Sequence, residues 1–122
     1  MAEPGIPDRF WPFADAFVAG ATLVIDRAKG SAHPRFPQIA YPLDYGYLEG
    51  TRAIDGDGVD VWRGSLAADS VTGVVASLDL TKRDGEIKLL VGCTQAEMQT
   101  ILAFHNQAEW VAGALIARPD GL

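Results

Sequence analysis

Mainly apolar residues recur at helical spacing, three or four positions apart, in two stretches toward the ends of the chain. In residues 6–20 the apolar positions fall in the second half, before Gly20: Phe10, Phe13, Ala14, Phe17 and Val18. In residues 94–106 one face carries Met98, Ile101, Leu102 and His105. Thr94 and Glu97 have the spacing of a capping box, which starts a helix. The pattern therefore predicts one helix in each stretch.

Between these stretches, runs rich in β-branched and aromatic residues predict strands. They are "ATLVIDR" at 21–27, "VDVWRGSL" at 59–66, "SVTGVVASLDL" at 70–80 and "EIKLLVG" at 86–92. Residues 28–38 are rich in turn formers and predict a loop, and 39–51 predict short extended pieces around a bend. Gly73 predicts a bulge or a barrel corner inside its strand. The tail, 109–122, is apolar and could close the core or join subunits, which leaves a homo-oligomer open.

Five or six short strands with flanking helices predict one mainly β domain of the α+β class, spanning residues 1–122. Because a closed sheet exposes no edge strand, we expect a small five-stranded OB-like closed barrel with helices packed outside it. The chain has 122 residues, of which 48% are hydrophobic, and this is enough for one core.

The composition argues against several classes of protein. With a net charge of −6 and no block of basic residues, the chain is not expected to bind nucleic acid, which needs a basic face. No apolar run approaches the roughly 18 residues of a membrane helix, and we expect neither a membrane partner nor a secretory signal. The single cysteine, Cys93, allows no internal disulfide. It predicts a buried thiol in a cytoplasmic protein.

Three aspartates crowd the stretch "AIDGDGVDVW" at residues 53–62. Asp55, Asp57 and Asp60 lie within six residues, and a bound cation would offset their mutual repulsion. An EF-hand is excluded, because the fifth, sixth and twelfth positions counted from Asp55 carry Val, Asp and Leu. A solvated Asp-Gly turn is the alternative that needs no cation.

Two further motifs flank the aspartates. The first motif begins upstream of the aspartates and includes them: it reads "YPLDYGYLEGTRAIDGDGVDV", and Asp55 follows Tyr45 by ten residues. The second motif lies downstream and reads "GEIKLLVG", which places an acid and a lysine on one face of a strand. Together with "LVID" near the start, these segments resemble the soluble, magnesium-dependent inorganic pyrophosphatases over residues 22–92. The resemblance implies an OB-like barrel in which Mg²⁺ is the cofactor. The implied reaction is hydrolysis of a small-molecule substrate, pyrophosphate, to two phosphates.

The resemblance also implies roles for the matching residues. The implied metal ligands are Asp55, Asp57, Asp60, Glu86 and Asp26, and Asp57 is also the implied general base. Tyr45 would hydrogen-bond a phosphate oxygen and Lys88 would face the substrate, which makes both catalytic and substrate-binding residues. Either Lys29 or Arg35 would replace a phosphate-binding lysine of the family. Either Asp79 or Asp84 would replace a further metal aspartate.

The chain also departs from the family. Gly58 replaces a proline between the aspartates, the chain is shorter, and "FHNQ" at 104–107 stands where the family has a Tyr-Lys phosphate-binding pair. We therefore expect a weaker grip on substrate, with a replacement cation from Arg52, Lys82 or Arg83. The alternative is a non-catalytic phosphate- or nucleotide-binding module on the same barrel. His33 and His105 are expected to be surface or helix-face groups, and the tryptophans core or interface residues.

Overall fold

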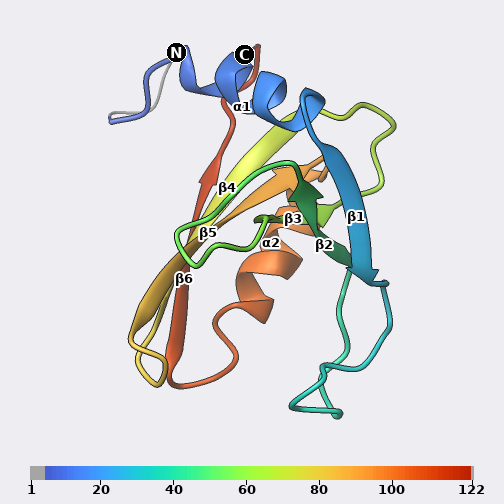
Figure 1. The fold of residues 1–122 in the computed structure, drawn as a ribbon, viewed down its shortest axis with the longest axis vertical. Coiled ribbons are helices and arrows are strands. Elements are labelled where there is room, and N and C mark those ends of the chain that lie inside the picture. Colours follow the sequence, from blue (N-terminus) through green and yellow to red (C-terminus); the bar gives the residue numbers. More distant parts are fainter. Residues whose placement is uncertain (1–4, 122) are drawn as a thin grey trace.

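The protein, seen in a computed structural model that describes residues 5–121, is built on one mixed sheet of six strands with two helices (Figure 1). In chain order the elements are α1 (Phe10–Ala19), β1 (Thr22–Arg27), β2 (Asp44–Glu49), β3 (Val59–Arg63), β4 (Val71–Asp79), β5 (Asp84–Val91), α2 (Gln95–Phe104) and β6 (Val111–Ala117). The strand order is β1-β2-β3-β5-β4-β6. The β3–β5 pair is parallel and the other pairs are antiparallel.

The sheet is open, and the predicted five-stranded closed barrel is therefore wrong in strand number and in closure. Strands β1 and β6 are the two edges, and no ladder joins them within residues 5–121. The additional strand, β6, comes from the apolar tail, whose run of small residues at 112–114 gives little β signal of its own. It forms because β4 offers a free edge, with which it pairs over seven residues.

Both faces of the central strands are buried. On β3, Val61 packs toward α1 while the next residue, Trp62, packs toward α2, and Leu89 and Leu90 alternate in the same way on β5. Figure 1 shows α1 lying across one end of the sheet. Burial on both faces accounts for the adjacent apolar residues near the ends of these strands, Val61–Trp62 on β3 and Leu89–Val91 on β5.

The predicted local signals at α2 and β4 are confirmed. Thr94 Oγ1 accepts a hydrogen bond from the Glu97 amide at 3.1 Å, and Glu97 Oε1 accepts one from the Thr94 amide at 2.8 Å, which completes the capping box. The register between β4 and β5 shifts between Val71 and Gly73, where the bulge was expected. Cys93 is buried, as predicted. No helix within residues 5–121 has the length and apolar character needed to span a membrane.

Candidate functional site

A cavity of about 890 Å³ opens on the face of the sheet against which α2 packs. Its floor is formed by alternate residues of three neighbouring strands: Tyr45 on β2, Asp60 and Trp62 on β3, and Glu86 and Lys88 on β5. Two loops, residues 28–43 and 105–110, supply its walls, and the turn between β4 and β5 supplies a third side. The cavity thus collects residues from segments that are far apart in the sequence.

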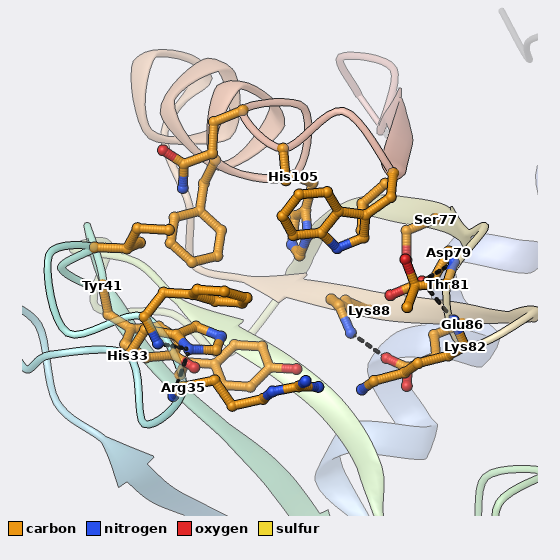
Figure 2. A pocket seen from close by; sticks show the side chains of 18 of the residues that line it. His33, Arg35, Tyr41, Ser77, Asp79, Thr81, Lys82, Glu86, Lys88 and His105 are labelled. Atoms are coloured by element: carbon orange, nitrogen blue, oxygen red, sulfur yellow. Dashed lines mark hydrogen bonds and ion pairs between the residues drawn. The ribbon is translucent and has the colours of Figure 1, made fainter.

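Lys88 lies at the centre of the cavity floor. Its side chain is buried, and its Nζ donates a 3.1 Å hydrogen bond to Asp60 Oδ2. A second hydrogen bond joins Nζ to Glu86 Oε2 (Figure 2). Asp60 lies directly opposite Lys88 in the parallel β3–β5 ladder, and Glu86 precedes Lys88 by two residues on the same face of β5. The Tyr45 ring completes the cluster, with its centroid 5.6 Å from Nζ. Strand pairing therefore places four of the predicted site residues together.

The cluster fixes the charge state of most of its members. Burial alone would lower the pKa of Lys88, but Tyr45, Asp60 and Glu86 around it raise that pKa, so the ammonium stays charged. Burial would raise the pKa of Glu86, yet the Lys88 hydrogen bond and charge outweigh it and the pKa is lowered. Burial raises the pKa of Asp60 against the opposing charge of Lys88. Burial also raises the pKa of Tyr45, which keeps its hydroxyl protonated and able to donate.

Two further cations face the cavity from opposite walls. Figure 2 shows the Arg35 and Lys82 side chains extending into the space in front of Lys88. Of the two alternatives for the phosphate-binding cation, Arg35 lines the cavity and Lys29 does not. Of the suggested replacement cations, Lys82 lines it as well. Three cations that line one cavity, Arg35, Lys82 and Lys88, suit a ligand with several anionic oxygens.

Short-range hydrogen bonds fix the backbone of the two segments that carry Arg35 and Lys82. The His33 Nδ1 atom accepts from the backbone amides of Arg35 and Phe36 at 3.1 and 3.2 Å. In the β4–β5 turn, Asp79 Oδ1 accepts from the amides of Thr81 and Lys82, both at 2.8 Å. Asp79 and Asp84 both line the cavity, so the structure does not separate them as the further acidic residue. Asp79 has a defined local task, which is to shape the turn that carries Lys82.

The remaining predicted ligands lie elsewhere. Asp55 and Asp57 are exposed in the loop between β2 and β3 and do not line the cavity, and the Asp57 amide donates to Asp55 Oδ1 at 3.0 Å. Asp26 is exposed on β1, where its carboxylate lies 3.9 Å from the neighbouring Arg27 guanidinium. Across residues 5–121 no three histidine, cysteine or acidic side chains are close enough together to hold a metal ion. The structure thus brings Asp60 and Glu86 together, apart from the other three.

Several cavity residues escaped the sequence analysis. His105 was expected on the helix face that also carries Ile101, and it is buried at the end of that face, but no local pattern indicates its contact with Trp62. His33 was expected at the surface, but it organises a loop, because its ring stacks on Tyr41 at a centroid distance of 5.8 Å. Phe36 and Trp110 come from the two wall loops and their ring centroids lie 5.9 Å apart. The only local signal for these four was an aromatic residue or histidine in a loop or near a helix end.

Solved structures with the same arrangement of strands and helices identify the fold. An inorganic pyrophosphatase from Neisseria gonorrhoeae superposes with a TM-score of 0.57 at 19% sequence identity, covering 78% of this chain and 80% of that one. The chain has an inorganic pyrophosphatase fold. The pyrophosphatases of Helicobacter pylori (TM-score 0.53, 17% identity, 78% and 81% covered) and Coxiella burnetii (0.52, 13%, 78% and 82%) agree. No family model and no curated protein sequence matches the chain.

The pyrophosphatase fold accounts for the order of the shared motifs along the chain. Tyr45, Asp60, Glu86 and Lys88, which carry the sequence resemblance, come from adjacent strands of that fold and meet at one cavity. At identities of 13–19% the likeness establishes the arrangement of the backbone, and the chemistry has to be argued from the side chains.

Proposed function

We propose that this protein hydrolyses a phosphoanhydride such as pyrophosphate, with Mg²⁺ as cofactor. The observation that carries the proposal is the cluster of Lys88, Asp60 and Glu86 on the floor of a large cavity, beside Tyr45, in a pyrophosphatase fold. In this reaction a water oxygen attacks one phosphorus and the bond from that phosphorus to the bridging oxygen breaks. The bridging oxygen leaves with the electron pair, the water proton passes to a base or to solvent, and the products are two phosphates.

The charges around the cavity support a divalent cation. Five carboxylates line it, from Asp60, Asp79, Asp84, Glu86 and Glu109, against the three cations Arg35, Lys82 and Lys88. A bare polyanion would be repelled by this excess of acid, whereas each magnesium ion bound with the anion would remove two negative charges and weaken that repulsion. Magnesium commonly uses one or two protein carboxylates and completes its coordination with water and substrate phosphates.

The donor chemistry of Asp60 and Glu86 fits such an ion. Both offer carboxylate oxygens inside the cavity, and Lys88 contacts Oδ2 of one and Oε2 of the other. When bound, the ion would lower the pKa of the attacking water and neutralise the leaving phosphate. The roles of Asp55, Asp57 and Asp26 as ligands, and of Asp57 as the general base, stay predictions.

The chain's own residues have separate tasks in this proposal. Lys88 holds the Asp60 and Glu86 carboxylates in a fixed orientation. The protonated Tyr45 hydroxyl can donate to a phosphate oxygen. Arg35 and Lys82 bind the outer phosphate oxygens from opposite sides, in place of the Tyr-Lys pair that the chain lacks. Positioning and electrostatic stabilisation of this kind supply most of the catalysis in phosphoryl transfer.

The test is phosphate release from pyrophosphate with magnesium and with a chelator, for the parent and four variants. Because Lys88→Met leaves two carboxylates without their shared cation, we expect at least a hundredfold loss of kcat/KM. Asp60→Asn removes a proposed ligand in the cavity, and Asp57→Asn removes a predicted ligand on the exposed loop. Comparing the two variants tests which carboxylate the activity needs. Leu78→Ala is the matched control, since Leu78 is 68% exposed on β4 between two cavity-lining residues. Turnover by the parent that is equal with and without chelator would contradict the magnesium proposal.

A non-catalytic phosphate- or nucleotide-binding module is the second candidate. The spread of the acidic residues favours it, because within residues 5–121 no three of them are placed to hold one ion. Saturable magnesium-phosphate binding with no phosphate release from pyrophosphate, triphosphate or nucleotides would select this candidate over the hydrolase.

A further inference from the structure

Aromatic and carboxamide side chains line the mouth of the cavity, in addition to the charged residues of its floor. The wall loop 28–43 presents Phe36 and Gln38, and the wall loop 105–110 presents Gln107 and Trp110. Each wall therefore places a carboxamide near an aromatic ring. The two rings meet at a centroid distance of 5.9 Å and an interplanar angle of 48°, and Trp110 keeps 40% of its surface exposed.

An inorganic substrate has no group that the two aromatic rings among these four residues would bind. Pyrophosphate presents only anionic oxygens, which recognise cations and metal ions and gain nothing from an aromatic face. The cavity volume of about 890 Å³ also falls at the upper end of the range for sites that enclose drug-sized organic ligands, about 300–1,000 Å³. Both the size and the lining of the cavity leave space for an organic group attached to the phosphates.

The aromatic and phosphate-binding parts of the cavity adjoin each other. The Arg35 guanidinium carbon lies 5.8 Å from the centroid of the Phe36 ring, so neighbouring residues of one loop supply a cation and an aromatic face. A ligand whose phosphates contact Arg35 and Lys82 would bring its next chemical group against this face. Planar heterocycles stack on aromatic side chains, and carboxamides can bond to their edges.

We propose that the ligand of this cavity is an organic phosphoanhydride with a planar heteroaromatic ring, that is, a nucleoside di- or triphosphate. The ring stacks on Trp110 and Phe36, its edge bonds to Gln38 or Gln107, and the phosphates bind between Arg35, Lys82 and Lys88. This rests on the proposed function for the phosphate end. The reaction is then attack of a water oxygen on the terminal phosphorus, with cleavage of the bond from that phosphorus to the bridging oxygen. The bridging oxygen leaves with the electron pair on a nucleotide with one phosphate fewer, a water proton passes to a base or to solvent, and inorganic phosphate is released.

The test compares two ligands that share their phosphates and differ in the ring. Calorimetry with Mg²⁺ measures the affinity of ADP and of methyl diphosphate for the parent protein. Stacking of one base contributes about 1–3 kcal/mol, so ADP should bind about 5- to 150-fold more tightly. Trp110→Ala should remove most of this preference and leave the methyl diphosphate affinity unchanged. Trp110→Phe should retain much of it, and Leu78→Ala should behave like the parent.

Equal affinity of the parent for both ligands, or no binding of either, overturns the proposal. An equal loss of both affinities in Trp110→Ala also overturns it, because the ring would then only support the loop, and Gln107→Ala repeats the comparison without removing a ring. Phosphate release is measured separately. A ring preference without turnover leaves this inference standing and rejects the hydrolase, whereas turnover of pyrophosphate without a ring preference does the reverse.

Discussion

The indole Nε1 of Trp62 donates a 3.0 Å hydrogen bond to Nε2 of His105, and both side chains are buried. An Nε2 atom that accepts a hydrogen bond carries no proton, so His105 is neutral in the folded protein. Burial, together with the nearby positive charge of Lys88, lowers its pKa from 6.5 to about 4. The contact therefore couples the fold to pH through a residue that lines the cavity.

The first prediction concerns stability in mild acid. The unfolded chain takes up a proton on His105 near its ordinary pKa of 6.5, while the folded protein resists until about 4, so stability falls as the pH falls through this range. Between pH 7 and pH 5 this residue should cost about 2 kcal/mol of unfolding free energy. Urea unfolding at both pH values measures it. His105→Gln cannot titrate and should lose about that much less, and an identical pH dependence in parent and variant would contradict the assignment.

The second prediction concerns the glycine of the "YGY" segment. A Cβ at Gly46 would lie 1.8 Å from the backbone oxygen of Val24, because β1 and β2 approach closely there. Gly46→Ala should therefore push β1 away from β2 and reduce the unfolding free energy by about 3 kcal/mol or more. Gly85→Ala is the control, since its nearest neighbour is the exposed end of Leu78 at 3.1 Å. Similar losses for the two variants in urea unfolding would refute the close-approach explanation.

The third prediction concerns the attachment of α1. Arg118 Nη1 donates to both carboxylate oxygens of Asp15 at 2.9 Å, and the Val71 amide donates to the same carboxylate. Because this half-buried pair ties α1 to β4 and the end of β6, Arg118→Met should lower stability by about 1.5–3 kcal/mol. Asp69→Asn removes a contact of a largely exposed carboxylate with Arg63 and should change little. Thermal unfolding compares them, and equal midpoints would count against the anchoring role.

The fourth prediction concerns the loop that carries Arg35. His33 Nδ1 accepts two backbone hydrogen bonds in this loop, and burial with the nearby charges of Arg27, Arg35 and Lys82 lowers the pKa of His33. His33→Leu should weaken binding of magnesium pyrophosphate about tenfold, since two hydrogen bonds that orient Arg35 are lost. His33→Asn, whose side-chain oxygen can accept, should recover part of the loss in calorimetry. Unchanged affinity in His33→Leu would remove the positioning role.

Sequence reasoning succeeded where the signals were local. The capping box of Thr94 and Glu97, the bulge near Gly73 and the acid and lysine on one face of β5 are all encoded within a few neighbouring residues. It missed β6, because alanine and glycine have little preference for strands and only pairing with β4 selects that conformation. We expected the sheet to close because proteins tend to avoid exposed edge strands, but this sheet is open and β1 and β6 are its edges.

The candidate site shows the same contrast between residues with a local sequence signal and residues placed by tertiary contacts. The motifs correctly singled out Tyr45, Asp60, Glu86 and Lys88 as residues that meet, since strand pairing brings the segments together. Of the wall residues, sequence reasoning named Arg35 beside Lys29 but did not find Trp110 as a cavity residue, because the course of the wall loops depends on tertiary contacts. The exposed position of Asp55 and Asp57 agrees with the Asp-Gly turn, which the sequence had left open beside a cation site.

The parallel pairing of β3 with β5 also sets an order for folding. Glu86 and Lys88 lie two residues apart on a hairpin strand, so their contact can form early, whereas Asp60 is separated from Lys88 by 28 residues and a parallel ladder. Pairings between distant residues form slowly, because loop closure must precede the contacts that compensate for it. We therefore expect a chain that has reached only its β4–β5 hairpin to hold two of the three charges, those of Glu86 and Lys88. Asp60 joins the cluster only when the parallel β3–β5 ladder forms, so a ligand that needs all three charges would stabilise only chains in which that ladder is in place.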